Sequence, residues 1–166
     1  SPKITIDTKA PAISISYSGA QVKNTVKDSS GNVRKYYNGT VTAKVTITEH
    51  NFDANRVNLS VSAKDVTGKA RNSNSLISKS AWSSKGDQHT ATVTFFGEAN
   101  YQLQVSCTDL AQNTIKSAYD SFTVDRTAPD HLKVSYSQSV LDTVLEAVSF
   151  GFYNAGVTVT ISAADQ

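Results

Sequence analysis

One stretch alternates strictly between apolar and polar residues: Val41-Thr42-Ala43-Lys44-Val45-Thr46-Ile47-Thr48. Successive side chains of a strand point to opposite faces of a sheet, so the stretch predicts a strand with one buried face. The same alternation recurs at Val57-Leu59-Val61-Ala63, Ala91-Val93-Phe95, Tyr101-Leu103-Val105-Cys107 and, after a break, Ala118-Phe122-Val124. Turn-forming residues separate these stretches, at Ser30-Gly31-Asn32, Thr67-Gly68-Lys69, Lys85-Gly86-Asp87 and Gly97-Glu98-Ala99-Asn100.

The number and spacing of these stretches indicate the fold class. About seven short strands separated by turns at regular intervals are typical of an antiparallel β-sandwich. No helix-length pattern lies between the strands, which argues against a parallel α/β fold. We therefore predict an all-β chain.

The chain also contains a long-period repeat. Ile4-Thr5-Ile6-Asp7-Thr8-Lys9-Ala10-Pro11 returns 118 residues later as Phe122-Thr123-Val124-Asp125-Arg126-Thr127-Ala128-Pro129. Beyond the proline, Ile13-Ser14-Ile15-Ser16-Tyr17-Ser18 returns as Leu132-Lys133-Val134-Ser135-Tyr136-Ser137, and Tyr36-Tyr37-Asn38-Gly39 as Phe152-Tyr153-Asn154-Ala155. A period of domain size predicts whole modules joined in series.

The repeat divides the chain into three parts. Residues 1–9 are expected to be a leader strand or the last strand of a preceding module, residues 10–127 one complete sandwich, and residues 128–166 the start of a second. That last part is too short to close a core alone, since chains below roughly 40 residues rarely fold unaided. Within it, apolar residues at spacings of three and four predict a short amphipathic helix over Ser139–Ser149.

Composition excludes several classes of partner and site. The formal charge is +2, from 16 basic and 14 acidic residues, and no run of five like charges occurs, so we expect neither nucleic acid nor an anionic membrane as the partner. No stretch approaches the roughly 18 apolar residues that a membrane span requires. The single cysteine, Cys107, excludes an internal disulfide framework and is expected to be a small buried apolar residue.

Nothing in the sequence indicates catalysis. The three histidines, His50, His89 and His131, lie on different expected elements, and no nucleophile elbow, HExxH helix or glycine-rich phosphate loop is present. We therefore expect no enzymatic activity.

Several motifs together are similar to the immunoglobulin-like (Ig-like) repeats of large Gram-positive bacterial surface proteins. They are Tyr36-Tyr37-Asn38, the stretch from Val45 to Asp53, the stretch from Gly86 to Phe95, Thr108-Asp109-Leu110-Ala111-Gln112-Asn113, and Val124-Asp125-Arg126-Thr127-Ala128-Pro129. The resemblance covers about residues 4–129. Gln112 stands where the family usually has glycine. Tyr101 is expected to be a tyrosine corner, whose hydroxyl returns to nearby backbone.

This resemblance implies a location and a role. The family's members are extracellular, attached to the cell wall or secreted, and the repeats are structural spacers that hold an adhesive or enzymatic head away from the cell. The expected partners are neighbouring Ig-like modules of the same chain. Two alternatives stay open: a module that itself recognises a host glycan or matrix protein, and an accessory domain of a large secreted hydrolase.

A metal site is one of two interpretations of the acidic residues near the module ends. Asp109 and Asn113 of one loop, with Asp125 or Asp7 of a linker strand, offer the oxygen ligands that Ca²⁺ prefers. Some Ig-like arrays of the family bind calcium at such junctions. The other interpretation is structural, because Asp in Asp-x-x-x-Asn also forms ordinary turns by bonding its own backbone.

One loop is the candidate for ligand binding. Glu49, His50, Asn51 and Asp53 follow the first alternating stretch, and Trp82 offers an aromatic surface elsewhere. Loop tips of sandwiches often bind partners. The alternative is that Phe52 anchors this loop in the core while Asn51 and Asp53 turn the chain.

Overall fold

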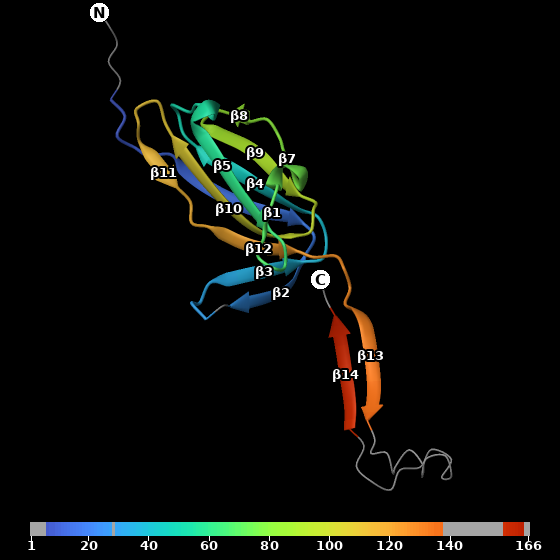
Figure 1. Ribbon diagram of the computed structural model, residues 1–166. Helices are drawn as coiled ribbons and strands as arrows, with labels where there is room; N and C mark the ends of the chain where they lie inside the picture. The colour runs from blue at the N-terminus through green and yellow to red at the C-terminus, as the bar shows by residue number, and fades with distance from the viewer. Residues whose placement is uncertain (1–5, 28, 138–157, 165–166) are drawn as a thin grey trace, which may run out of the picture. The chain divides into compact units, whose positions relative to one another are not determined.

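The structure is a computed structural model that describes residues 6–27, 29–137 and 158–164 of the 166-residue chain (Figure 1). Strands dominate these residues, so the all-β prediction is confirmed. Contacts divide the chain into two compact units, Ser1–Arg126 and Thr127–Gln166, each with its own sheets. Within the described residues, no helix has the length and apolar character needed to cross a membrane.

The first sheet of unit 1 contains five strands. Its order is β1-β4-β9-β7, and β8 pairs with β9 beyond the end of β7. Every neighbouring pair is antiparallel. The strands are β1 (Ala12–Gly19), β4 (Val41–Thr48), β7 (Ile77–Lys79), β8 (Ser83–Lys85) and β9 (Gln88–Phe95).

The second sheet of unit 1 contains seven strands in the order β2-β3-β12-β10-β5-β6, with β11 also paired to β10. The β3–β12 pair is parallel, and the other pairs are antiparallel. The strands are β2 (Val22–Lys27), β3 (Val33–Tyr37), β5 (Val57–Lys64), β6 (Ala70–Arg71), β10 (Ala99–Thr108), β11 (Thr114–Lys116) and β12 (Asp120–Val124). Two short 3-10 helices, η1 (Ala54–Arg56) and η2 (Ser73–Ser75), lie between strands.

The two sheets pack face to face as a sandwich. In β4, the residues expected to point inward, Val41, Ala43, Val45 and Ile47, are fully buried. Phe95 of the first sheet packs edge-on against Tyr101 and Phe122 of the second, with ring centroids 4.9 and 4.8 Å apart. Burying such a side chain stabilises the fold by roughly 1.5–3 kcal/mol. The inward faces of β4, β9 and β10 therefore form the core. The predicted inward residues Val57, Leu59 and Val61 of β5 are half-buried against it, and Ala118, predicted to continue the last stretch, is exposed and precedes β12.

A tight corner leads from the first sheet to the second. The Tyr101 ring is buried, and its hydroxyl donates a hydrogen bond of 2.7 Å to the carbonyl oxygen of Gly97. Gly97 is required there, because a Cβ at this position would collide with the side chain of Leu76. The expected return of the Tyr101 hydroxyl to nearby backbone is confirmed.

Unit 2 contains a two-stranded antiparallel sheet, β13 (Asp130–Ser137) with β14 (Thr158–Ala164). Its register repeats that of β1 and β4. Tyr17 pairs with Ala43 in unit 1, and Tyr136 pairs with Val159 in unit 2. Tyr136 ends the copy of the Ile13–Tyr17 sequence, and Val159 is the third residue of Val157-Thr158-Val159, as Ala43 is of Val41-Thr42-Ala43. The helix predicted over Ser139–Ser149 lies outside the described residues.

Candidate metal centre

Three carboxylates converge at one end of the sandwich. Glu49 directly follows β4, Asp109 directly follows β10, and Asp7 lies on the leader segment that precedes β1. Because β1 is antiparallel to β4, with Ala12 opposite Thr48, the start of one strand meets the end of the other. One carboxylate oxygen from each of the three residues lies within 4.8 Å of the other two. Asp109 is fully buried, and Glu49 is 7% exposed.

A short turn fixes Asp109. Its Oδ1 accepts a hydrogen bond of 2.8 Å from the backbone N–H of Asn113, and its Oδ2 accepts one of 2.8 Å from the Asn113 side-chain amide. The backbone of Gln112 closes the turn at a φ of 71°, in the left-handed region that glycine normally occupies. Asp109 thus bonds the backbone of its own turn, as the structural interpretation of Asp-x-x-x-Asn expects, and the same turn directs Asp109 toward the other two acids.

Asp7 ties the leader segment to this end of the sandwich. Its Oδ2 accepts a hydrogen bond of 2.6 Å from the Asn51 side-chain amide, and its backbone carbonyl accepts one of 3.2 Å from the Asn113 side-chain amide. The backbone N–H of Lys9 donates to Oδ1 at 2.9 Å. These bonds, first that from Lys9 and then that from Asn51, lower the pKa of the Asp7 carboxyl. Asp7 is therefore held in its charged form.

Among the described residues, the three carboxylates form no direct ion pair, although the nearby charges of His50 and Lys9 also act on Asp7. None of the ion pairs found there involves Asp7, Glu49 or Asp109. Glu49 accepts a hydrogen bond of 2.7 Å from the backbone N–H of Asn51. Like charges at this separation repel each other, and the burial of Glu49 and Asp109 reduces the screening of their charges by water. A bound cation would offset both the repulsion between the carboxylates and the cost of burying their charges.

The donor set fits a hard cation. Calcium takes six to eight oxygen ligands from carboxylates, carbonyls and water, whereas zinc prefers nitrogen and sulfur. The cluster offers three carboxylates and no histidine or cysteine. A hollow of about 200 Å³ opens beside it, lined in part by Asp7, Glu49 and His50, which leaves room for water ligands. Asp7, Glu49 and Asp109 would hold Ca²⁺, which would supply charge neutralisation and a link between the leader and two strand ends.

The structure brings together three of the residues predicted for a metal, Asp7, Asp109 and Asn113. It places Asp125 at the other end of β10. Val124 pairs with Ala99 at the start of that strand, whereas Asp109 follows its last residue, and ten residues of strand span roughly 33 Å. Asp125 instead donates its backbone N–H to the carbonyl of Tyr37.

Glu49 is the acid that sequence reasoning assigned to another role, the ligand loop. A signal for its position exists in the sequence. It is the first residue after a strictly alternating strand, and the matching stretch of the repeat, Val157 to Ala164, is also followed by an acid, Asp165. This repeated acid is the signal that could have pointed to Glu49.

The other candidates for a ligand loop stabilise the loop itself. Asp53 caps η1 by accepting from the backbone N–H of Asn55 at 2.9 Å. His50 contacts the Asp87 carboxylate at 2.9 Å, and this contact raises the pKa of the exposed His50 imidazole. Trp82 is half-buried and packs edge-on against Phe52, with ring centroids 5.3 Å apart.

Phe52 anchors this loop. Its ring stacks on the buried imidazole of His89 at 3.9 Å, and Nε2 of His89 lies 2.8 Å from the backbone carbonyl of Glu49. The anchoring that the sequence suggested for Phe52 is therefore confirmed. It also steadies the backbone that carries Glu49.

No protein family, curated protein or solved structure matches this chain.

Proposed function

We propose that this chain is a spacer from a tandem array of Ig-like modules in a bacterial extracellular surface protein, an adhesin attached to the cell wall. In this proposal, each linker strand ends one module and, through an acidic residue, fastens to the next. Calcium is the cation that completes the fastening. The neighbouring modules of the same chain are the partners.

The observation that carries this proposal is the repeated hairpin. The pairing of β1 with β4 recurs in β13 with β14 at equivalent residues, such as Ile15 with Val45 and Val134 with Ile161. An isolated hairpin of this kind is marginal by itself. As the opening of a second module it would gain a core to pack against, which supports an array of modules.

The order of strands supports the Ig-like assignment. Constant-type Ig domains place their first, second, fifth and fourth strands in one sheet and their third, sixth and seventh in the other. If β1, β4, β5, β7, β9, β10 and β12 are taken in chain order as these seven strands, the sheets β1-β4-β9-β7 and β12-β10-β5 have that order. Tyr101, near the start of the sixth of these strands, supplies the corner hydrogen bond.

The repeat also supports the role of the linker. Asp125 lies 118 residues after Asp7, in the same Asp-x-x-Ala-Pro sequence. Asp7 contacts the module that follows it through Asn51 and Asn113. Asp125 therefore has the corresponding place before the next module, which explains why it lies far from Asp109. Pro129 keeps the residue before it extended.

Small-angle scattering of a chain extended to complete the second module tests this function. We expect an elongated particle in calcium, whose maximum dimension shortens when Asp125 becomes Asn and the link to module two weakens. Asp7→Asn is the matched control, because it removes the same charge before module one and should leave the link to module two unchanged. A wild-type chain with a broad, collapsed distance distribution in calcium would contradict the spacer role.

A further inference from the structure

A second hollow lies on the outer face of the seven-stranded sheet, away from the acidic cluster. Its volume is about 420 Å³, within the range of roughly 300–1,000 Å³ that is usual for small-molecule sites. Arg34 and Tyr36 of β3, Gln102 of β10, Ser121 of β12 and the preceding Tyr119 line it. The residues come from three neighbouring strands, so the sheet itself forms the floor.

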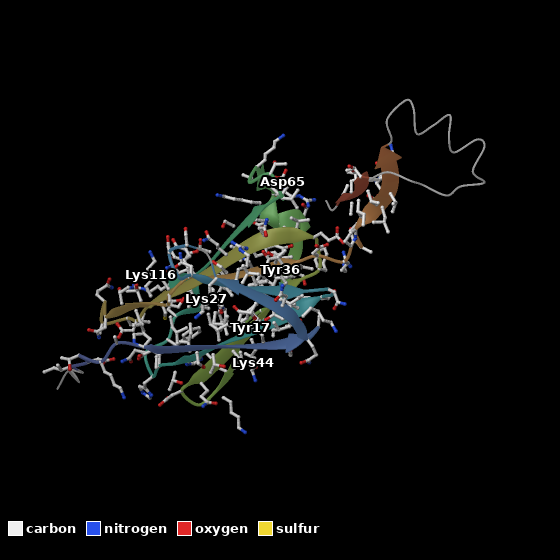
Figure 2. All side chains as sticks on the ribbon, turned by 90° about the horizontal axis from the view of Figure 1, so that it is seen from below. Tyr17, Lys27, Tyr36, Lys44, Asp65 and Lys116 are labelled. Atoms are coloured by element: carbon white, nitrogen blue, oxygen red, sulfur yellow. The ribbon has the colours of Figure 1, made fainter. Side chains whose placement is uncertain are left out.

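Two tyrosines line this hollow. Tyr119 is 62% exposed although its ring is large and apolar. Tyr36 lies next to the core residue Tyr37 in β3 and therefore points to the opposite, outer face. Figure 2 labels Tyr36 on β3 and Lys27 on the neighbouring strand β2. Exposed aromatic rings of this kind pack against the apolar C–H faces of sugar rings, while their hydroxyls remain available for hydrogen bonds.

Arg34 is held in place by one of its nitrogens. Its Nη1 donates to the carbonyl of Phe122 at 3.2 Å, to Oγ1 of Thr123 at 3.4 Å and to Oδ1 of Asn100 at 3.5 Å. Among the described residues, all its hydrogen bonds run through this atom, so Nη2 and Nε remain for a ligand. The guanidinium is thus oriented before a ligand arrives, which lowers the entropic cost of binding.

The charge of the hollow favours an anion. Arg34 is the only side chain with a formal charge among the described residues that line it, and no Asp or Glu is among them. A guanidinium pairs best with a planar carboxylate, which it binds through two parallel hydrogen bonds. Gln102 and Ser121 add neutral polar groups of the kind that bind sugar hydroxyls.

We propose that this outer face binds an acidic oligosaccharide, one that contains uronic acid residues. The carboxylate pairs with Arg34, and sugar rings stack on Tyr36 and Tyr119. This ligand-binding activity is separate from the spacer role and from the loop of Glu49 to Asp53. It does not depend on a cation at the acidic cluster.

Chemical-shift titration of the ¹⁵N-labelled chain tests the proposal. The acidic probes are oligogalacturonate, oligoalginate and hyaluronan oligosaccharide. The methyl ester of oligogalacturonate is the neutral control, because it has the same sugar rings without the charge. We expect at least one acid to bind with a millimolar or lower Kd and to shift amides of β3, β10 and β12. We expect the ester to bind about tenfold more weakly, since it lacks the charge-assisted pair with Arg34.

Three variants locate the site. Tyr119→Ala should weaken binding about fivefold, because it removes one stacking ring, whereas Tyr119→Phe should retain binding. Both changes are at an exposed position, so the fold is preserved. Arg34→Gln should abolish the preference for the acid over the ester. The proposal is overturned if no acid binds in the millimolar range, if acid and ester bind equally, or if the shifts map to the Glu49–Asp53 loop.

Discussion

The hydroxyl of Tyr101 donates a 2.7 Å hydrogen bond to the carbonyl oxygen of Gly97, four residues earlier in the chain. The ring is buried between the two sheets, where Phe95 and Phe122 contact it. Burial raises the pKa of the Tyr101 hydroxyl to about 12, so it stays neutral and donates at any ordinary pH. This one side chain joins the corner before β10 to the core.

Tyr101→Phe should therefore lower the free energy of unfolding by about 1 kcal/mol, because the ring stays packed while the half-buried Gly97 carbonyl loses this hydrogen bond. Urea denaturation followed by circular dichroism measures this loss. Tyr119→Phe is the matched control, since Tyr119 is exposed, and should change stability by less than about 0.5 kcal/mol. Equal effects of the two changes would show that the corner hydrogen bond contributes nothing.

Gln112→Gly should stabilise the chain. Gln112 has a φ of 71°, where a residue with a Cβ is strained by roughly 1–2 kcal/mol, and glycine is not. Glycine also has greater freedom in the unfolded chain, which lowers the free energy of unfolding by about 0.5–1 kcal/mol. The net increase in the free energy of unfolding is therefore about 0.5–1 kcal/mol. Thermal unfolding in a calorimeter measures it. A loss of stability would mean that the Gln112 side chain makes a stronger contribution than its backbone strain costs.

His50 should titrate above its usual pKa of 6.5, because the Asp87 carboxylate favours the imidazolium. A group whose pKa is raised on folding contributes stability that is fully present below pH 6.5 and is lost as the pH rises through the folded value. Both side chains are exposed, so this contribution is small. Proton NMR of the His50 ring measures the pKa directly. Asp87→Asn should lower the pKa of His50; an unchanged value would exclude Asp87 as the cause.

Calcium should raise the melting temperature of the chain by roughly 5 °C when it is present at ten to a hundred times its Kd. Glu49→Gln should remove this shift, because it takes away one carboxylate charge but leaves Oε1 to accept from the backbone N–H of Asn51. In a chelator, the variant should be at least as stable as the wild type, since repulsion within the cluster falls.

Asp125→Asn is the control for that experiment. It removes one negative charge at the opposite end of β10 and should keep the full calcium shift. If calcium stabilises the Glu49 variant as strongly as the control, the cation binds elsewhere. Absence of any shift in the wild type would remove calcium from the proposed function and leave packing alone to hold the leader segment.

The strands of the core could be predicted because their signal is local. The predicted strand Val41–Thr48 has the same bounds in the structure, and its inward residues are all buried. The same holds for the buried residues Ala91, Val93 and Phe95 of β9. The β2–β3 ribbon could not be predicted in this way. Its strand β2 is exposed on both faces, so it carries no apolar alternation.

The candidate site could be predicted in part. Asp109 and Asn113 lie in one loop, and the turn they form depends only on residues close together in the sequence. Whether Asp7 or Asp125 joined them was open, because the linker sequence occurs twice. The pairing of β12 with β10 decides the matter, since it directs Asp125 away from that loop.

The sequence by itself determined which face of the strands β4, β9 and β10 is buried, that two copies of one opening sequence are present, and where the tight turns lie. These properties depend on periodicity and on residues close together in the chain. Only the tertiary structure decided that Glu49 joins Asp7 and Asp109, and that Tyr36 and Tyr119 line one hollow. The physical reason is that both sites are made by strand order: which ends and faces meet depends on how the sheets pair, and no local pattern encodes that pairing.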